Sequence, residues 1–257
     1  MRILFIFVTN VIKSPIIKGL NQKEYILIFF FVHLQKNQIN LMAKLLIIGA
    51  GGFGKEVAYY CKSLNTSFGT YEVAGFIDDA PEKKGLEVIY GLKVIASSDD
   101  VLQNKKLFKD FQFCLAFAEV KARLKMAEKM EKEGFIFPNL IHSSVNIDSS
   151  VHLGRGNIFA HRAVTTCDIE IGSFNVVNGY SGFGHDVKVG DHNIFASGIA
   201  ILGEVTIKDF NVFHTNSCVL PRINIGSGNI FSVGSVVMKN TGDGNKYWGS
   251  PARILNV

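Results

Sequence analysis

Apolar residues occupy every sixth position in the C-terminal part of the chain. From Ile147 to Val237, each step of six falls on an apolar residue except at Thr165. A period of six matches neither an α-helix nor the two-residue alternation of a strand, and it predicts a parallel β-helix built from hexapeptides. Asparagine and glycine recur every eighteen residues, which predicts three hexapeptides per coil and an internal ladder of asparagine amides. The recurring positions are Asn157, Asn175, Asn193, Asn211 and Asn229, with Gly154, Gly172, Gly190 and Gly226.

A different pattern precedes the repeat. An apolar run begins at Lys44 and ends in a glycine-rich turn, and a helical stretch follows over 55–64. A second strand is predicted over 71–77, and a helix over 119–133 that stops at Gly134. This alternation of strands and helices is typical of an α/β domain of the Rossmann type. The predicted domains are the Rossmann-like domain over 42–139 and the β-helix over 140–257.

The glycine-rich turn is a candidate phosphate site. Gly49, Gly51 and Gly54 fit the spacing G-x-G-x-x-G, in which missing side chains let backbone N–H groups at a helix N-terminus approach a phosphate. Asp78 and Asp79 follow the second strand at its carboxyl end, where open α/β sheets bind their ligands. The alternative is a turn that only connects strand to helix, beside two solvated aspartates.

Residues 1–41 fit neither domain. They are rich in Ile, Phe, Lys and Asn, and their longest apolar run, over 25–32, is shorter than the roughly 20 residues that a membrane-spanning helix needs. Because Met42 directly precedes the first strand, we interpret it as the natural start and residues 1–41 as upstream sequence or a disordered extension. A peripheral membrane anchor is the alternative.

The composition limits the kinds of partner. Hydrophobic residues make up 47% and charged residues 19%, which is typical of a folded globular protein. The net charge of +5 is spread along the chain, so no nucleic-acid groove is indicated. The four cysteines lie far apart without C-x-x-C spacing, so neither a disulfide framework nor a zinc site is predicted. We interpret them as reduced core thiols of a cytoplasmic protein.

The combination of a glycine-rich domain and hexapeptide repeats resembles the bacterial sugar O- and N-acyltransferases, which include sialic-acid O-acetyltransferases and nucleotide-4-amino-sugar N-acetyltransferases. The resemblance covers nearly all of residues 43–255. It implies a left-handed β-helix that transfers an acetyl group from acetyl-CoA to an amino or hydroxyl group of a nucleotide-linked sugar, in surface polysaccharide or glycan biosynthesis. The matching segments run from Leu46 to Gly54, Gly75 to Asp79, Asn139 to His142, Gly184 to Asp191, Asn216 to Pro221 and Gly249 to Arg253.

The resemblance also implies roles for individual residues. In this family the histidine of the His-Asp or His-Glu pair is the general base, which places that role on His185, with Asp186, or a carboxylate from another coil or subunit, to orient its ring. A sugar hydroxyl or amine loses a proton as it attacks a thioester, and imidazole ordinarily titrates near neutral pH, which suits that transfer. Acetyl-CoA is expected between two subunits of a homotrimer, and the acceptor, with a UDP-linked amino sugar favoured, at the glycine-rich turn. The expected acetyl-CoA contacts are Ile194, Gly203, Thr215 and Val233, and the expected acceptor contacts are Gly51, Gly52, Phe53, Asp78 and Asp79.

Two positions depart from the family, and two other function classes stay open. Ile194 stands where the subfamily has a second histidine that contacts the cofactor, and His214 replaces a glycine beside the pantetheine path. An NAD-dependent oxidoreductase is suggested by the glycine-rich domain alone, but it leaves the β-helix unexplained. A noncatalytic β-helix scaffold would need no base at His185.

Overall fold

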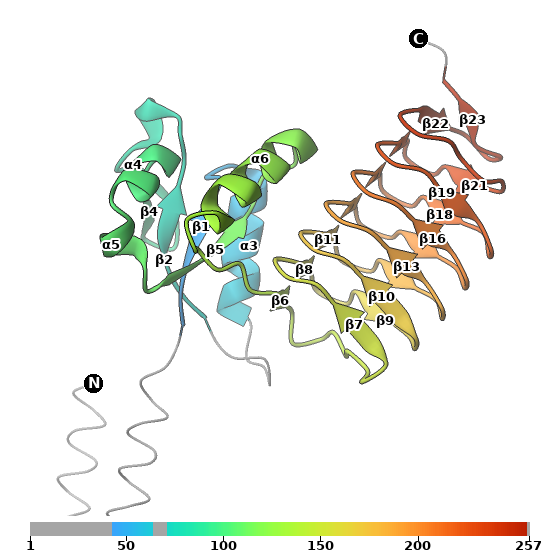
Figure 1. Ribbon diagram of the computed structural model, residues 1–257, viewed down its shortest axis with the longest axis horizontal. Helices are drawn as coiled ribbons and strands as arrows, with labels where there is room; N and C mark the ends of the chain where they lie inside the picture. Colours follow the sequence, from blue (N-terminus) through green and yellow to red (C-terminus); the bar gives the residue numbers. More distant parts are fainter. Residues whose placement is uncertain (1–42, 64–70, 256–257) are drawn as a thin grey trace, which may run out of the picture. The chain divides into compact units, whose positions relative to one another are not determined.

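The computed structural model describes residues 43–63 and 71–255 of the chain (Figure 1). They form an α/β domain followed by a left-handed parallel β-helix, so the predicted fold class is confirmed. The prediction for residues 1–41 concerns a segment outside the described residues and stays a prediction. Within the described ranges, no helix combines the length and the apolar character that a membrane crossing requires.

The α/β domain contains a five-stranded sheet in the order β3-β4-β2-β1-β5. β1 pairs in parallel with both β2 and β5, whereas β3 and β4 form an antiparallel hairpin. The strands are β1 (Ala43–Ile48), β2 (Tyr71–Ile77), β3 (Glu87–Ile89), β4 (Leu92–Ala96) and β5 (Phe111–Leu115). The helices are α3 (Gly52–Ser63), the 3₁₀ turn η2 (Pro81–Lys83), α4 (Ser98–Gln103), α5 (Lys105–Phe108) and α6 (Val120–Glu131). The predicted strand over 71–77 and the two predicted helices are therefore present, whereas the β3–β4 hairpin, α4 and α5 were not predicted.

Strand β1 is buried on both faces of the sheet, which explains its continuous apolar run. Successive side chains of a strand point to opposite faces. Leu45 and Ile47 accordingly pack into the cluster that includes α3, whereas Leu46 and Ile48 pack into the cluster that includes α4 and α6. The glycine-rich turn that follows β1 is thereby anchored at the centre of the domain.

The β-helix has three sheets, one for each side of its coil. Each sheet is named after the one of the consecutive strands β7, β8 and β9 that it contains. The β7 sheet has the order β19-β16-β13-β10-β7, the β9 sheet has the order β21-β18-β15-β12-β9, and the β8 sheet has the order β23-β22-β20-β17-β14-β11-β8-β6. The strands are β6 (Leu140–Ile141), β7 (Val151–Leu153), β8 (Ile158–Phe159), β9 (Val164–Thr165), β10 (Ile169–Ile171), β11 (Val176–Val177), β12 (Gly182–Phe183), β13 (Lys188–Val189), β14 (Ile194–Phe195), β15 (Ala200–Ile201), β16 (Thr206–Ile207), β17 (Val212–Phe213), β18 (Cys218–Val219), β19 (Asn224–Ile225), β20 (Ile230–Phe231), β21 (Val236–Val237), β22 (Lys246–Trp248) and β23 (Arg253–Ile254).

The six-residue apolar series forms the core of the β-helix. Paired strands are offset by eighteen residues, so equivalent side chains stack along the axis. The rings of Phe195, Phe213 and Phe231 lie one above the next, with centroids 5.1 and 4.5 Å apart. Burial of such a ladder removes apolar surface from water at every coil, which stabilises the stack.

The predicted asparagine ladder is present inside the β-helix. The Oδ1 atom of each asparagine accepts hydrogen bonds from the next coil, as Asn175 Oδ1 does from the backbone N–H of Asn193 at 2.8 Å and from its side-chain amide at 3.1 Å. All five predicted asparagines are fully buried. The ladder also extends one step beyond the prediction at each end, to Asn139 and Asn245.

Every sixth residue from Gly156 to Gly234 has a positive φ, which turns the chain at each corner of the coil. Most of these corner residues are not glycine, and the left-handed conformation costs an ordinary L-residue about 1–2 kcal/mol. Their backbone N–H groups donate hydrogen bonds to the preceding coil. The Asp186 N–H donates to Cys167 O at 3.3 Å, and the Glu204 N–H donates to His185 O at 2.9 Å. Bonds between neighbouring coils therefore hold a strained corner in place.

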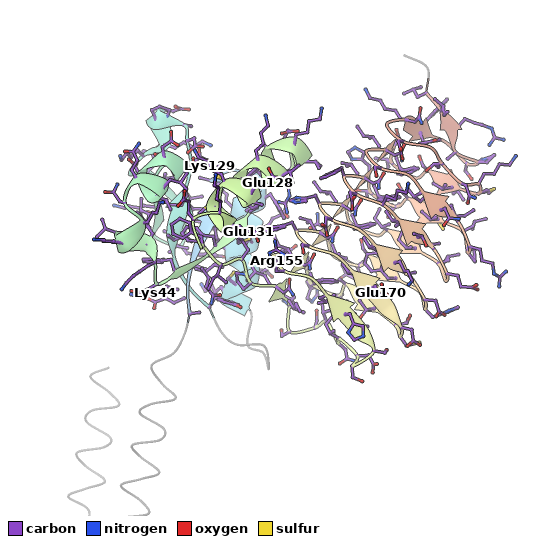
Figure 2. All side chains as sticks on the ribbon, viewed as in Figure 1. Lys44, Glu128, Lys129, Glu131, Arg155 and Glu170 are labelled. Atoms are coloured by element: carbon purple, nitrogen blue, oxygen red, sulfur yellow. The ribbon has the colours of Figure 1, made fainter. Side chains whose placement is uncertain are left out.

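Helix α6 attaches the α/β domain to the corner between β10 and β11. The ring of Phe174 at that corner is buried in the cluster that includes α6. Near the start of α6, Arg123 donates to Phe174 O at 3.0 Å, and at its end Glu131 accepts a hydrogen bond from Arg155 Nη2 at 2.8 Å (Figure 2). Ile158 and Val176 of the β8 sheet pack into the other cluster, with α3. The α/β domain therefore covers the first two coils of that sheet.

We expect Asn193→Ala to destabilise the protein by about 3 kcal/mol, because it leaves a buried N–H and a buried side-chain amide of Asn211 without their acceptor. Chemical denaturation measures this change. The matched control is Asn224→Ala, whose exposed side chain makes no ladder contact, and which should change the free energy of unfolding little. Equal effects of the two substitutions would contradict the ladder's role.

Candidate active site

His185 lies at the exposed corner between β12 and β13. Its side chain is 58% exposed, so the imidazole can meet a ligand from solution. Equivalent positions on the neighbouring coils hold Cys167, Gly203 and Pro221, as the eighteen-residue spacing predicts. The apolar neighbours in sequence, Phe183 and Val189, point into the core. The imidazole is thus presented on the surface by a fully packed coil.

Asp186 holds one side of the imidazole ring. Its backbone is left-handed, a conformation that aspartate tolerates better than most residues, and this turns the carboxylate back toward the ring. Asp186 Oδ2 lies 2.8 Å from His185 Nδ1. A carboxylate accepts a hydrogen bond from Nδ1–H, which assigns the proton to Nδ1 and leaves Nε2 as the nitrogen that can accept a proton.

The other side of the ring lies against Gly203 on the next coil. A Cβ atom at position 203 would lie 2.6 Å from His185 Nε2, so only glycine leaves room for the ring. A Cβ atom on Gly184 would in turn approach Gly203 N to 2.8 Å. Within the described part of the chain, the Gly203 N–H donates no hydrogen bond, so the residue that packs against the ring also carries a free donor. An acceptor atom of a ligand could therefore meet a base and a donor at the same corner.

The second group of predicted residues surrounds the N-terminus of α3. Gly49 is required by packing, since a Cβ atom there would lie 2.7 Å from Ala116 O. Gly51 and Gly52 face open space, where an added Cβ would meet nothing within 4 Å. Phe53 is half-buried and packs against the core of the domain, so only part of its ring is available to a ligand. The two exposed glycines therefore leave room for a ligand at the end of the helix.

Asp78 and Asp79 lie beside this turn but make different contacts. Asp78 Oδ2 accepts from Ala50 N–H at 2.8 Å and from Lys83 Nζ at 3.0 Å. Burial raises the pKa of Asp78, but these hydrogen bonds outweigh it and leave the pKa below its ordinary value, so the carboxylate is charged at neutral pH. Asp79 instead accepts from the backbone N–H and the hydroxyl of Ser98 at the start of α4. Asp78 therefore stabilises the glycine-rich turn, whereas Asp79 holds the start of α4.

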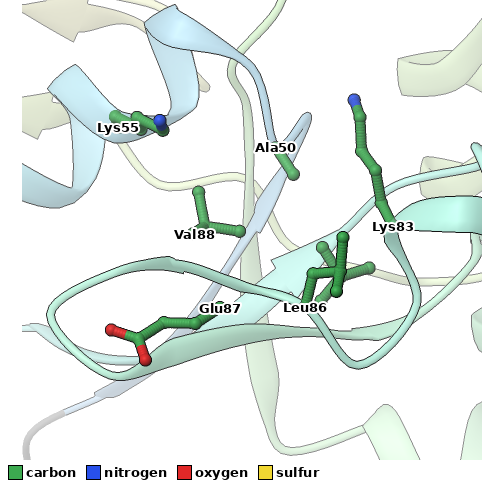
Figure 3. Close-up of a pocket in the computed structure, with 7 residues that line it drawn as sticks. Ala50, Lys55, Lys83, Leu86, Glu87 and Val88 are labelled. Atoms are coloured by element: carbon green, nitrogen blue, oxygen red, sulfur yellow. The ribbon is translucent and has the colours of Figure 1, made fainter.

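A pocket of about 170 Å³ opens next to the turn, and sequence reasoning missed its two lysines (Figure 3). Lys55 comes from the first turn of α3, and Lys83 comes from η2 on the opposite side. Both cations add to the positive end of the helix dipole. Lys55 could have been predicted, because it directly follows the last glycine of the motif, whereas no motif in the sequence points to Lys83. The remaining lining residues are Ala50, Leu86, Glu87, Val88 and Val94.

The residues expected to contact acetyl-CoA do not lie together in one chain. Gly203 is at the His185 corner, and Ile194 faces outward on β14 of the β8 sheet. Thr215 and Val233 are exposed on successive coils of a third place, the corner between the β8 and β9 sheets. His214 precedes Thr215 at that corner and is exposed as well. A single molecule of acetyl-CoA would touch all of them only if a second copy of the chain supplied some.

Comparison with known proteins identifies one matching domain family and several solved structures with a similar fold. The PglD N-terminal domain family matches residues 44–130. A search of curated protein sequences finds no match. Among solved structures, PerB from Caulobacter crescentus, in complex with CoA and GDP-perosamine, is 23% identical, with a TM-score of 0.75 over 84% of this chain and 99% of its own.

Two further structures are more similar in sequence. The acetyltransferase domain of PglB from Neisseria gonorrhoeae, in complex with acetyl coenzyme A, is 25% identical, with a TM-score of 0.73 over 84% of this chain and 100% of its own. WeeI from Acinetobacter baumannii is 29% identical, with a TM-score of 0.71 over 82% of this chain and 99% of its own. The resemblance to the sugar acyltransferases with a hexapeptide-repeat β-helix is therefore confirmed.

We expect Gly203→Ala to displace the His185 ring while the fold persists, because its Cβ atom would collide with Nε2 and the backbone φ at 203 is not left-handed. A crystal structure of the variant, and the rate at which a histidine-directed reagent modifies His185, measure the displacement. Gly242→Ala is the matched control, since its Cβ atom would meet its nearest neighbour at an ordinary 3.7 Å. An unchanged ring position in Gly203→Ala would show that the packing is looser than described.

Proposed function

We propose that this chain transfers the acetyl group of acetyl-CoA to an amino or hydroxyl group of a nucleotide-linked sugar, with His185 as the general base. The observation that carries this proposal is the His185–Asp186 pair at an exposed corner, where no described residue hydrogen-bonds to Nε2 or accepts from the N–H of Gly203, which packs against the ring. PglB, whose acetyltransferase domain resembles this chain, binds acetyl coenzyme A, and PerB binds CoA and GDP-perosamine. An amino sugar is accordingly the favoured acceptor, in a pathway of surface polysaccharide or glycan synthesis.

The proposed proton transfer follows from the tautomer that Asp186 imposes. His185 Nε2 takes the proton from the acceptor group as that group attacks, and Asp186 stabilises the resulting imidazolium through its bond to Nδ1. Acetyl-CoA supplies a thioester carbonyl whose oxygen gains negative charge during the attack. The Gly203 N–H is the donor proposed to stabilise that oxygen, since it is preorganised and spends no hydrogen bond elsewhere in the described chain. The protonated imidazole then returns its proton to the departing thiolate.

The acceptor's nucleotide is proposed to bind at the glycine-rich turn. Gly51 and Gly52 expose backbone at the N-terminus of α3, where the helix dipole favours phosphate. Lys55 and Lys83 line the adjoining pocket and can donate to phosphate oxygens, with the charge of Lys83 already offset by Asp78. In this arrangement Asp78 acts by orienting Ala50 and Lys83, and the direct contacts of Phe53 and Asp79 with the nucleotide stay proposals.

Two of the three sides of the β-helix present apolar residues outward, which supports the proposed homotrimer. The β7 sheet is polar outside, but the β9 sheet presents small and apolar side chains, and the β8 sheet stays apolar beyond the coils that the α/β domain covers. These two sides are neighbours on the coil, so one can pack against the other on a second copy in a ring that closes. The outward residues are Val164, Gly182, Ala200, Cys218 and Val236 on the β9 sheet, Ile194, Val212 and Ile230 on the β8 sheet, and His152, Glu170, Lys188, Thr206 and Asn224 on the β7 sheet.

The proposed compartment is the cytoplasm, where thiols stay reduced. All four cysteines are free, but Cys167 is exposed and Cys218 is half-buried, because both lie on the outer surface of the β-helix, so the prediction that all four are core thiols is wrong for these two. Burial raises the pKa of Cys61 to about 12, and it also raises that of Cys114, so both are protonated, unreactive thiols in the core.

We expect His185→Ala to lower the turnover rate by roughly 10²–10⁴, the usual contribution of a positioned general base. Free-thiol release from acetyl-CoA in the presence of a panel of nucleotide-linked amino sugars measures the turnover. Thermal stability and acetyl-CoA binding should barely change, because the exposed ring is not part of the core. The loss should also shrink at high pH with an amine acceptor, since more of the amine is then already deprotonated.

The matched control for this substitution is His152→Ala, an exposed histidine on the polar β7 sheet. It should keep the turnover of the original protein. If His185→Ala kept it too, the general-base role would be wrong and a noncatalytic scaffold would become the better reading.

We expect Ala200→Arg to dissociate the trimer, because it places a charge at the centre of the outward apolar face of the β9 sheet. Analytical ultracentrifugation measures the assembly. Thr206→Arg, on the exposed polar side, is the control and should leave the assembly intact. A protein that is monomeric at micromolar concentration before any substitution would rule out the trimer and the shared site.

A further inference from the structure

Arg123 is a fully buried arginine that the proposed reaction does not use. It lies in the first turn of α6, and none of its surface is exposed. Its guanidinium donates to three backbone carbonyl oxygens: Nη1 to Leu115 at 2.7 Å and Phe117 at 3.1 Å, and Nη2 to Phe174 at 3.0 Å. Among the described residues no carboxylate forms an ion pair with it, and its Nε atom is buried without a partner.

Stability alone gives a poor reason for such a residue. Burial lowers the pKa of Arg123 to about 10, which still leaves it charged at neutral pH. Taking a guanidinium group out of water has a large cost in free energy, which hydrogen bonds to neutral carbonyl groups offset only in part. An apolar residue cannot replace the planar guanidinium group, whose N–H groups form a fork that donates to several carbonyl groups in fixed directions.

The three carbonyl groups belong to the two parts that the proposed reaction must align. Leu115 and Phe117 flank Ala116, whose carbonyl group lies against Gly49 at the start of the glycine-rich turn. Phe174 is a left-handed corner residue of the β-helix, in the coil that leads to His185. Arg123 therefore connects residues beside the glycine-rich turn, the proposed acceptor site, directly to the β-helix that carries His185.

We propose that Arg123 is a positioning residue, which holds the glycine-rich turn at a fixed place relative to the β-helix so that the bound acceptor reaches the acetyl group. This inference rests on the proposed function. The nearby pair of Arg155 and Glu131 joins the same two parts but is exposed at Arg155, so it contributes less to alignment. Arg123 acts from inside the junction, where water does not compete for the carbonyl groups.

The test compares Arg123→Met, which has a similar volume but no hydrogen-bond donor, with Arg123→Lys, which keeps the charge but lacks the planar guanidinium group that reaches the three carbonyl groups in fixed directions. Lys129→Met is the matched control, since Lys129 is a cation on the same helix that bonds to Asp99 inside the α/β domain (Figure 2). For both Arg123 variants we expect kcat with a nucleotide-linked amino sugar to fall roughly 10- to 100-fold, as small misplacements of a substrate do. The KM for that acceptor and the Kd for acetyl-CoA should stay close to those of the original protein, whereas the melting temperature should fall in Arg123→Met, because two buried carbonyl groups lose their donor.

Hydrogen–deuterium exchange supplies a readout that does not need activity. The amides of residues 115–119 and 173–175 should exchange faster in Arg123→Met than in Lys129→Met, because the bonded carbonyl groups at the junction are released. A protein without acetyltransferase activity would refute the proposed function, and this measurement would still decide whether Arg123 holds the junction.

The inference would be overturned by an Arg123→Met variant with unchanged kcat or unchanged exchange. It would also be overturned by a rise in the acceptor's KM with kcat intact, which would indicate damage to the turn itself. Failure of both Arg123 variants to fold would assign Arg123 to folding alone.

Discussion

The bonding of each coil to the coils above and below it, at a spacing of eighteen residues, is the constraint on which the rest of the structure depends. It fixes the asparagine ladder from Asn139 to Asn229 and the stacked phenylalanines inside the β-helix, and only the last step of the ladder, to Asn245, spans sixteen residues. Because a coil is stabilised by its neighbours, the strained left-handed corners persist without glycine at most positions. A surface residue at a corner can then change without loss of the core, which frees such positions for chemistry.

The His185 corner shows how the repeat serves a reactive group. Asp186 occupies the left-handed position that every corner requires, and the same backbone turn brings its carboxylate to His185. One coil further on, Gly203 leaves the space into which the ring fits. The three residues of the proposed site are therefore placed by the period of the fold.

This periodicity also explains how much could be predicted from the sequence. The inward apolar series, the asparagine ladder and the corner shared by His185 and Gly203 follow from counting six and eighteen. The β3–β4 hairpin carries no such period, because its strands are short. Arg123 was missed because it is one of several cations along a predicted helix, and its burial depends on Phe174, which is 51 residues away. Lys83 likewise reaches its place through a turn that no motif marks.

The position of the α/β domain along the rod links the two proposed binding sites. It covers Ile158 and Val176, the outward residues of the first two coils of the β8 sheet, and it reaches Ile194 only in part. Ile194 follows His185 by nine residues, so both lie within one coil of eighteen. The edge of the domain therefore falls at the level of the base. In the proposed ring of copies, with the β-helices parallel to the symmetry axis, the edge of the domain in one copy would lie at the same level as the His185 corner of the next. An acceptor held at that edge would have a short path to Nε2, and the rigid attachment of α6 through a buried arginine would then act on the distance that the chemistry depends on.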